Sequence, residues 1–342
     1  MSEPAPRARR RVTITDVGEA AGVSASTVSR VLNGTAKVDP ALVQRVHDVV
    51  RELGYQPNAA AQGLARGEWG TVGVLVPDLA NPYFPDVLKA VSAVARERGK
   101  RVMVMESDEN PAIERSLVED LMRSCDGVLL CSPRMPLADL VDLIGREHPM
   151  VLVNRTVPGA AVPSITVDHS GGMTLVCGHL AQLGHRRIAY LNGPESSWAN
   201  SERLRALEAA AALGLDVTVV PCGADATSGY EAMAAVPLAD VTAIATYNDL
   251  VALGAIARLR DMGVAVPEEM TVVGFDDLSL EWVAHSRLTT VSVARDEVGR
   301  RAAEMLEQLM AAGHDSEPRE VAMELRVRDT SGPPRAAPPV LS

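Results

Sequence analysis

Residues 13–33 read TITDVGEAAGVSASTVSRVLN, the pattern of two short helices joined by a sharp turn. Thr13 can cap the first helix, with Asp16 three residues later as its capping-box partner. Gly22 supplies the turn, and Ser24 can cap the second helix. Two helices joined in this way form a helix-turn-helix unit, whose second helix enters the major groove of DNA. The stretch therefore predicts a DNA-binding module at the start of the chain.

The second predicted helix carries a face of small polar side chains and one arginine, which could not fill a hydrophobic core. Small hydroxyls suit phosphate oxygens, whereas Arg30 suits the edge of a guanine. The predicted DNA contacts in and around this helix pair are Thr13, Ser24, Ala25, Ser26, Thr27, Ser29, Arg30, Asn33 and Lys37. We expect Ala25, Ser26 and Arg30 to face the bases. The alternative is an ordinary helix pair with a solvated polar face.

A third helix follows the pair. Asp39 and Pro40 form a helix start, and the apolar spacing up to Leu53 predicts a helix that packs on the first two. A glycine then ends it. We therefore assign residues 1–12 to a disordered basic tail and residues 13–57 to a helix-turn-helix headpiece.

Four motifs together resemble the lactose-repressor/galactose-repressor (LacI/GalR) family of bacterial transcription regulators. They are DV-x-x-x-AGVS-x-x-TVSRVLN at 16–33, YQPN at 55–58, A-x-x-L at 61–64 and GFDD at 274–277. The motifs extend over nearly the whole chain. The resemblance implies a headpiece and hinge that bind operator DNA, and a core that binds a small effector.

The resemblance also implies that residues 58–67 form a hinge helix on DNA. A stretch this short and rich in alanine is a weak helix by itself, so it should fold only beside a second copy. Leu64 is its one large apolar side chain. Two symmetry-related leucines could wedge between bases from the minor groove, or they could merely pack against each other. We assign DNA contacts in this segment to Asn58, Ala61 and Leu64.

From residue 71 onward, short β-branched runs alternate with amphipathic helices, in two series that predict two parallel-sheet lobes. The fold class is α/β: an N-terminal all-α helix-turn-helix headpiece with a hinge helix, followed by a two-lobed core that resembles periplasmic binding proteins. By the resemblance, the last helix and strand cross back to the first lobe. We assign residues 71–162 and 291–330 to the first lobe and 163–290 to the second. The proline-rich tail, 331–342, is predicted to be disordered.

The composition fits a folded protein of several domains. The chain has 342 residues, of which 47% are hydrophobic, so it can build sizeable cores. Residues 1–70 hold nine Lys and Arg against seven Asp and Glu, although the whole chain has a net charge of −11. So weakly basic a headpiece predicts a homodimer on a pseudo-palindromic operator. The four cysteines lack metal-ligand spacing, so we expect reduced thiols, no metal and no cofactor.

A ligand between two α/β lobes meets the carboxyl ends of the strands. The predicted effector contacts just past those strands are Asn81, Tyr83, Phe84, Asn154, Arg155, Asn248 and Asp276. The resemblance adds Arg203, near a helix start where relatives place an effector-gripping arginine, and Trp198 lies close enough to offer a stacking face. Each of these residues also has a purely structural alternative, such as a helix cap for Asp276 or a solvated charge for Arg203.

The predicted pocket favours a carbohydrate effector over a purine, because an aspartate, two asparagines and an arginine can bind paired hydroxyls. Where many relatives carry a stacking aromatic, this chain has Ala224. The effector's identity stays open, as does the choice between release from DNA and recruitment to it. Release, which would make the protein a repressor, is the commoner case among relatives. An effector-free or purine-dependent regulator is the alternative.

Other function classes find little support in the sequence. There is no nucleophile elbow, phosphate-binding loop or H-E-x-x-H motif, so we do not expect an enzyme. A transport-type solute-binding protein would share the two lobes, but it would lack residues 1–66 and carry a signal peptide. The first residues lack the apolar run of a secretory signal, and no stretch approaches a membrane span. We therefore expect a cytoplasmic protein.

Overall fold

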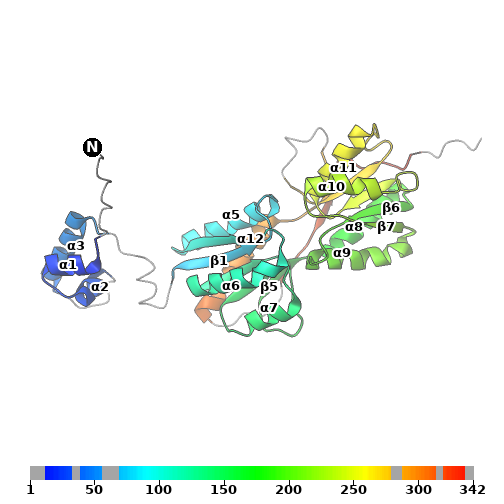
Figure 1. Ribbon diagram of the computed structural model, residues 1–342. Coiled ribbons are helices and arrows are strands. Elements are labelled where there is room, and N and C mark those ends of the chain that lie inside the picture. The colour runs from blue at the N-terminus through cyan, green and yellow to red at the C-terminus, as the bar shows by residue number, and fades with distance from the viewer. Residues whose placement is uncertain (1–11, 33–38, 56–68, 279–286, 313–318, 336–342) are drawn as a thin grey trace, which may run out of the picture. The chain divides into compact units, whose positions relative to one another are not determined.

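The computed structural model describes residues 12–32, 39–55, 69–278, 287–312 and 319–335. It divides into two units, residues 1–69 and residues 70–342 (Figure 1). Within the described ranges, no helix combines the length and the apolar character needed to cross a bilayer. The hinge segment and nearly all of a helix predicted at 278–284 lie outside the described residues.

Within its described residues, the first unit has three helices around a small valine-rich core. They are α1 (Ile14–Ala21), α2 (Ala25–Leu32) and α3 (Pro40–Leu53). Thr13 and Asp16 form the predicted capping box, and Gly22 ends α1 in the left-handed conformation, with φ of 68°. Ser24 Oγ accepts a hydrogen bond from the Thr27 N–H at 3.2 Å, which caps α2. The fully buried core residues are Val17, Ala21, Val28, Val31 and Val46.

The first lobe of the second unit is a six-stranded parallel sheet with the order β11-β5-β4-β3-β1-β2. Its strands are β1 (Thr71–Val76), β2 (Arg101–Glu106), β3 (Gly127–Cys131), β4 (Met150–Val153), β5 (Ser164–Val167) and β11 (Arg319–Val321). Helices cover both faces (Figure 1). On one face lie α5 (Tyr83–Glu97) and α12 (Arg295–Ala312), and on the other lie α6 (Pro111–Ser124) and α7 (Leu137–Ile144).

The second lobe repeats this design with the strand order β12-β10-β9-β8-β6-β7. Its strands are β6 (Arg187–Asn192), β7 (Asp216–Pro221), β8 (Ala243–Thr246), β9 (Thr271–Asp276), β10 (Thr289–Ser292) and β12 (Glu324–Arg326), of which only β12 is antiparallel to its neighbour. The helices are α8 (His169–Leu183), α9 (Trp198–Glu208), η1 (Ala209–Leu213), α10 (Ala226–Ala232), η2 (Met233–Ala235) and α11 (Asp249–Asp261). Cores form on both faces, with α8 and α9 on one side and α10 and α11 on the other.

The predicted lobe boundaries need correction, because three strands pair differently. β5 was assigned to the second lobe, but it pairs with β4 in the first sheet. β10, which straddles the predicted boundary at 290/291, pairs with β9 in the second sheet. The last predicted strand does not simply return to the first lobe, since β11 joins the first sheet and β12 joins the second. Buried strands have the same residue pattern in either sheet, so periodicity could not assign them.

The predicted disordered tail also needs correction over residues 331–335. The Gly332 N–H donates to Thr271 Oγ1 at 3.0 Å, and its carbonyl lies 2.9 Å from His185 Nε2. Ser331 Oγ lies 3.0 Å from His179 Nε2. Side chains of the second lobe thus satisfy the backbone of this segment, which its proline-rich composition could not reveal. Residues 336–342 lie outside the described ranges.

Candidate functional site

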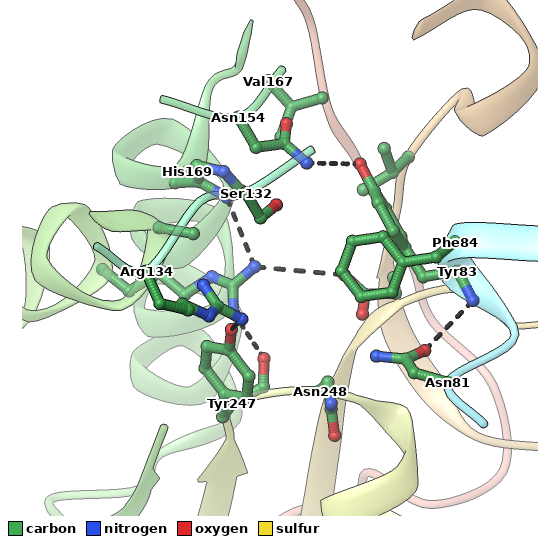
Figure 2. Close-up of a pocket in the computed structure, with 14 residues that line it drawn as sticks. Asn81, Tyr83, Phe84, Ser132, Arg134, Asn154, Val167, His169, Tyr247 and Asn248 are labelled. Carbon is green, nitrogen blue, oxygen red and sulfur yellow. Dashed lines mark hydrogen bonds and ion pairs between the residues drawn. The ribbon is translucent and has the colours of Figure 1, made fainter. Parts of the chain in front are cut away.

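A cleft lies where strands of both lobes end, and fourteen residues line it (Figure 2). The first lobe and its crossover contribute Asn81, Tyr83, Phe84, Ser132, Arg134, Asn154, Val167 and Val293, and the second lobe contributes His169, Ala199, Arg203, Tyr247, Asn248 and Asp276. This is the carboxyl edge of the parallel strands, where α/β proteins bind ligands. A ligand in the cleft would contact both lobes.

Three lining residues that follow strands have left-handed backbone conformations. Ser132 follows β3 with φ of 46°, Asn154 follows β4 with φ of 54°, and Asp276 ends β9 with φ of 111°. Such conformations are unfavourable for residues other than glycine and cluster at ligand sites. The backbone therefore bends sharply at the three strand ends that turn side chains toward the cleft.

Arg203 is a buried cation in the cleft. It enters from the first turns of α9, is 3% exposed, and lies with its guanidinium carbon 3.6 Å from the centre of the Phe275 ring. Its Nη1 donates to the Tyr247 carbonyl, and its Nη2 lies 3.3 Å from His169 Nδ1. Stacking on an aromatic ring stabilises a desolvated cation. The alternative of a solvated helix charge is therefore wrong for Arg203.

The Asp276 carboxylate faces this guanidinium at 3.9 Å, too far for a strong hydrogen bond. Burial raises the pKa of Asp276 to about 6, although the charges of Arg203 and Arg295 oppose the rise. The arginine and the carboxylate thus keep hydrogen-bonding capacity that they do not spend on each other. That is the state expected of groups that bind a polar ligand between them.

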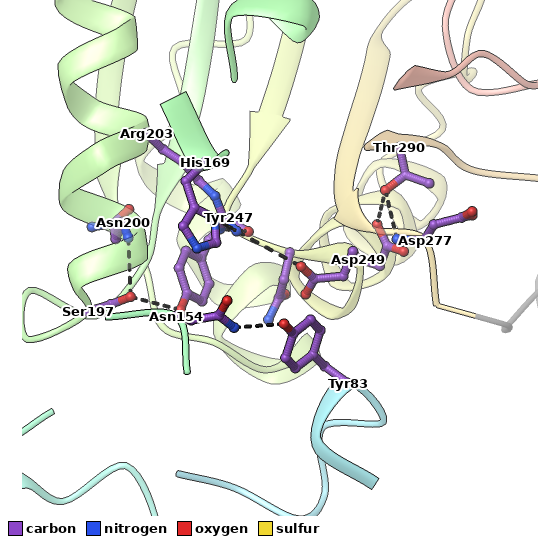
Figure 3. Close-up of polar contacts among 12 residues, drawn as sticks. Tyr83, Asn154, His169, Ser197, Asn200, Arg203, Tyr247, Asp249, Asp277 and Thr290 are labelled. Carbon is purple, nitrogen blue, oxygen red and sulfur yellow. Dashed lines mark hydrogen bonds and ion pairs between the residues drawn. The ribbon is translucent and has the colours of Figure 1, made fainter. Parts of the chain in front are cut away.

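A second buried carboxylate, Asp249, holds the backbone next to the cleft in place. It accepts hydrogen bonds from Thr290 Oγ1 at 2.6 Å and from the Leu278 N–H at 2.7 Å, so it fixes the chain after Asp276 (Figure 3). Burial, together with the nearby charge of Asp276, raises the pKa of Asp249 to about 8. A carboxyl with this pKa is largely protonated at neutral pH.

Asp249→Asn is expected to flatten the pH dependence of stability. A carboxyl whose pKa is higher in the folded than in the unfolded state stabilises the fold at low pH, and this contribution is lost as the pH rises through its folded pKa. The parent should therefore lose more stability than Asp249→Asn between pH 5 and pH 9. Thermal unfolding of both proteins across this range measures the difference. Asp240→Asn, which changes an exposed aspartate, is the control, and a curve for Asp249→Asn parallel to the parent's would contradict the expectation.

Asn154 presents an acceptor without a partner. Its Nδ2 donates to the Tyr83 hydroxyl at 2.7 Å, whereas its buried Oδ1 has no hydrogen-bond partner among the described residues (Figure 3). A buried acceptor left unpaired costs roughly 1–3 kcal/mol. A ligand that donates to Asn154 Oδ1 would recover that energy.

Arg134 bridges the two lobes across the cleft, and the sequence analysis did not identify it. It extends from the loop after β3 and makes two hydrogen bonds to the Glu109 carboxylate, at 2.6 and 2.9 Å. Its Nη2 also donates to the Tyr247 hydroxyl of the second lobe at 3.3 Å. Tyr247 in turn lies 3.1 Å from Ser197 Oγ. This arginine therefore has its charge balanced within the protein.

The structure brings seven of the nine predicted effector residues to the cleft: Asn81, Tyr83, Phe84, Asn154, Arg203, Asn248 and Asp276. Asn248 is also the cap of α11, accepting from the Val251 N–H at 2.9 Å, so its structural alternative holds as well. Arg155 and Trp198 do not line the cleft. Arg155 donates to the Pro133 carbonyl at 2.9 Å, and Trp198 packs edge-on against His169.

The sequence analysis missed seven lining residues, namely Ser132, Arg134, Val167, His169, Ala199, Tyr247 and Val293. The sequence pattern could have identified several of them. Ser132 and Arg134 come just past β3, and His169 comes just past β5, so the rule that selected Asn154 applies to them as well.

The predicted DNA-contacting face of the first unit is exposed or half-buried wherever it is described. Ser26 and Arg30 are exposed, while Ala25, Thr27 and Ser29 are half-buried. Ser24 Oγ lies within 2.9 Å of the hydroxyls of its neighbours on this face. The Arg30 guanidinium folds along its own helix, donating to the Ser26 carbonyl at 3.3 Å. The remaining predicted contacts lie outside the described residues: Asn33, Lys37, Asn58, Ala61 and Leu64.

Comparison with known protein families covers both units. Residues 69–327 match the periplasmic binding proteins and sugar binding domain of the LacI family, and residues 13–58 match the bacterial regulatory proteins of the lacI family. Over 300 residues the chain is 37% identical to the HTH-type transcriptional regulator GalR of Escherichia coli (strain K12), covering 86% of this chain and 88% of that protein.

Solved structures resemble the chain over the same extent. The Lac repressor dimer bound to operator and the anti-inducer ONPF matches with a TM-score of 0.81 and 27% identity, covering 94% of this chain and 100% of that one. A complex of the transcriptional regulator CelR with cellobiose matches with a TM-score of 0.69 and 30% identity, with the same coverage.

Proposed function

The chain belongs to the LacI family of bacterial regulatory proteins, and on that premise we propose that it is a repressor which a neutral carbohydrate releases from its operator. Like its relatives, it is a DNA-binding transcriptional regulator, and it is not an enzyme. The observation that supports a carbohydrate is a set of buried polar atoms in the cleft without partners among the described residues: Asn154 Oδ1, His169 Nε2 and Arg203 Nε. Donors and acceptors from both lobes match a ligand covered with hydroxyls.

The charge of the cleft favours a neutral ligand. Arg134 is neutralised by Glu109, and Arg203 is opposed by Asp276, so among the described lining residues no cation is left over for a phosphate or a carboxylate. Burying an unbalanced charge is costly, which disfavours sugar phosphates. CelR, a relative of known structure, binds cellobiose.

A thermal-shift screen of the full chain tests this assignment. A ligand that binds only the folded state raises the unfolding temperature, and its concentration sets the size of the shift. We expect a neutral mono- or disaccharide to raise it, and nucleobases and sugar phosphates to have no effect. The same carbohydrate should release the chain from its operator in a DNA titration. Stabilisation by a nucleobase alone would instead make this a purine-dependent regulator.

The link between the cleft and the rest of the core runs through Arg295, at the start of α12. Its guanidinium donates to the carbonyls of Asp276 and Asp277, at the end of the effector-facing strand. Its Nε donates to the Asp86 carboxylate of α5 at 2.9 Å. A ligand that moves Asp276 would therefore also move α5, because Arg295 is bonded to both. Effector binding changes operator affinity only to the extent that the ligand prefers one lobe arrangement, as linkage requires.

The protein acts as a homodimer on a pseudo-palindromic operator in the cytoplasm, where that DNA lies. The weakly basic first unit supports this, because a second copy doubles the phosphate contacts. A related dimer, that of the Lac repressor, has been solved on its operator. Light scattering of the full chain, alone and with DNA, should give twice the mass of the chain. A monomer that stays monomeric on DNA, or a tetramer that survives dilution, would contradict the proposal.

Pairing of two hinge segments couples the dimer to DNA. Residues 58–67, which lie outside the described ranges, should become helical only when two copies lie together on the operator, so hinge folding and DNA binding form one equilibrium. Leu64 would then wedge between bases at the centre of the operator.

Arg30→Ala is expected to relax base selection at one position in each half-site, at a cost of roughly 1–3 kcal/mol there. The Arg30 side chain is exposed, and its long bond to the Ser26 carbonyl is weak enough to exchange for a guanine. Selection from random DNA, performed with parent and variant, measures the effect. Ser29→Ala should weaken binding to all sequences alike. If Arg30→Ala selected the parent's consensus unchanged, Arg30 would not read a base.

A further inference from the structure

His169 occupies the point at which the chain leaves the first sheet for the second lobe. It is the first residue of α8, directly after β5, and Asp168 caps the helix by accepting from the Gly171 N–H at 2.7 Å. The imidazole lines the cleft and is only 4% exposed. Phe275 and Trp198 enclose it, with ring centres 6.2 and 6.0 Å away. The ring therefore has a fixed orientation.

The neighbours of His169 determine which nitrogen carries the proton. Its Nδ1 lies 3.3 Å from Nη2 of Arg203, and a guanidinium can only donate hydrogen bonds. Nδ1 must therefore accept, which places the proton of the neutral ring on Nε2. Burial holds the pKa of His169 well below its usual range, and the positive charges of Arg203 and Arg134 lower it further. The ring is thus a neutral N–H donor.

This donor has no partner in the part of the chain that the structure describes. His169 Nε2 is buried and makes no hydrogen bond to any described residue. Among the described residues, Nε of Arg203 is a second unpaired donor in the same cleft, and Asn154 Oδ1 is an unpaired acceptor. A buried N–H left unpaired is unfavourable, so a ligand oxygen placed there would gain a hydrogen bond at a favourable position.

We propose that His169 determines effector specificity by donating a hydrogen bond from Nε2 to an oxygen of the bound carbohydrate. The inference rests on the proposed function and extends it to the substituent that the ligand must carry. A hydroxyl, ring or glycosidic oxygen has a lone pair for this donor. A protonated amino group has none and would also meet the charge of Arg203, so amino sugars are rejected at this position.

Two substitutions separate this role from a purely structural one. In His169→Asn, the amide oxygen can take the place of Nδ1 and keep the bond from Arg203, but nothing replaces the Nε2 donor. In His169→Gln, the amide nitrogen can reach the position of Nε2, but the acceptor for Arg203 is lost. A ligand-binding role predicts that His169→Asn is the more damaging change. A role limited to holding Arg203 predicts the reverse.

The experiment is calorimetry on the full chain with cellobiose, D-glucose, D-galactose, D-ribose and D-glucosamine. We expect His169→Asn to weaken the best-binding neutral sugar at least tenfold, on the scale of one lost buried hydrogen bond, and His169→Gln to stay within about threefold. D-Glucosamine should bind less tightly than D-glucose. Nitrogen NMR of labelled histidine should show His169 neutral and protonated on Nε2 between pH 6 and pH 8, with a shift when sugar binds.

The outcomes distinguish the inference from the function on which it rests. If no neutral sugar binds the parent, the proposed carbohydrate function fails, and the inference fails with it. If a sugar binds the parent and His169→Asn equally well, the proposed function stands and the inference is overturned. A ring protonated on Nδ1, or one that titrates between pH 6 and pH 7, would also overturn it.

Discussion

Arg203→Ala should weaken effector binding at least tenfold while leaving operator affinity in the absence of effector almost unchanged. The guanidinium is buried against Phe275 and opposes Asp276 across 3.9 Å, so its loss leaves a buried carboxylate without its counter-charge. Removing one partner from a buried charged pair costs about 3–5 kcal/mol, and part of that cost falls on the binding of the ligand. Asp276→Ala should weaken binding to a similar extent for the converse reason.

Calorimetry with the sugar from the screen and titration with operator DNA test both halves of this prediction on one preparation. Arg205→Ala is a matched control, because Arg205 lies on the same helix with a side chain that is 63% exposed. It should change neither affinity. Should Arg203→Ala bind effector as tightly as the parent, the cleft is not the effector site. Loss of operator binding without effector would mean that Arg203 supports the fold rather than the ligand.

The strand pattern predicted several of the side chains that line the cleft. Asn154 and Asp276 were selected because they follow buried runs, and parallel strands necessarily bring such positions to one edge. Both line the cleft in left-handed conformations. Arg134 was missed because a cation three residues past a strand looks like a solvated loop charge until its partner, Glu109, is known. That partner lies 25 positions away in the sequence.

The lobe assignment failed for a different physical reason. β5 and β10 are short, largely buried runs of four residues, and a run of this kind can pair in either sheet. Which sheet a strand joins depends on which other strand it pairs with. That pairing involves residues far apart in the sequence, and the periodicity of one strand carries no information about it. The packing of residues 331–335 is likewise decided by distant residues, such as Thr271 and His185. Local sequence patterns predicted helices and their caps, whereas the pairing of strands could be seen only in the structure.

Two glycines allow α10 and α11 to pack with their backbones in contact. A Cβ atom at Gly254 would lie 1.9 Å from the carbonyl oxygen of Ala226 and 2.8 Å from the backbone nitrogen of Tyr230. A Cβ atom at Gly229 would lie 2.3 Å from the carbonyl oxygen of Val251. These are backbone atoms, which cannot turn aside as a flexible side chain can. The helices would have to move apart, together with Asn248 at the start of α11, which lines the cleft.

Gly254→Ala is therefore expected to destabilise the second lobe by roughly 3 kcal/mol, the upper end of the range for overpacking, and to lower its unfolding temperature by roughly 6–12 °C. Gly178→Ala is the matched control, because Gly178 lies within α8 and its added Cβ would meet no atom within 4 Å. That change should stabilise by about 0.5–1 kcal/mol, since alanine favours a helix over glycine. Thermal unfolding followed by circular dichroism measures both variants. Equal unfolding temperatures for Gly254→Ala and the parent would mean that α10 and α11 can separate at no cost, and that their close contact does not hold the effector-facing end of α11 in place.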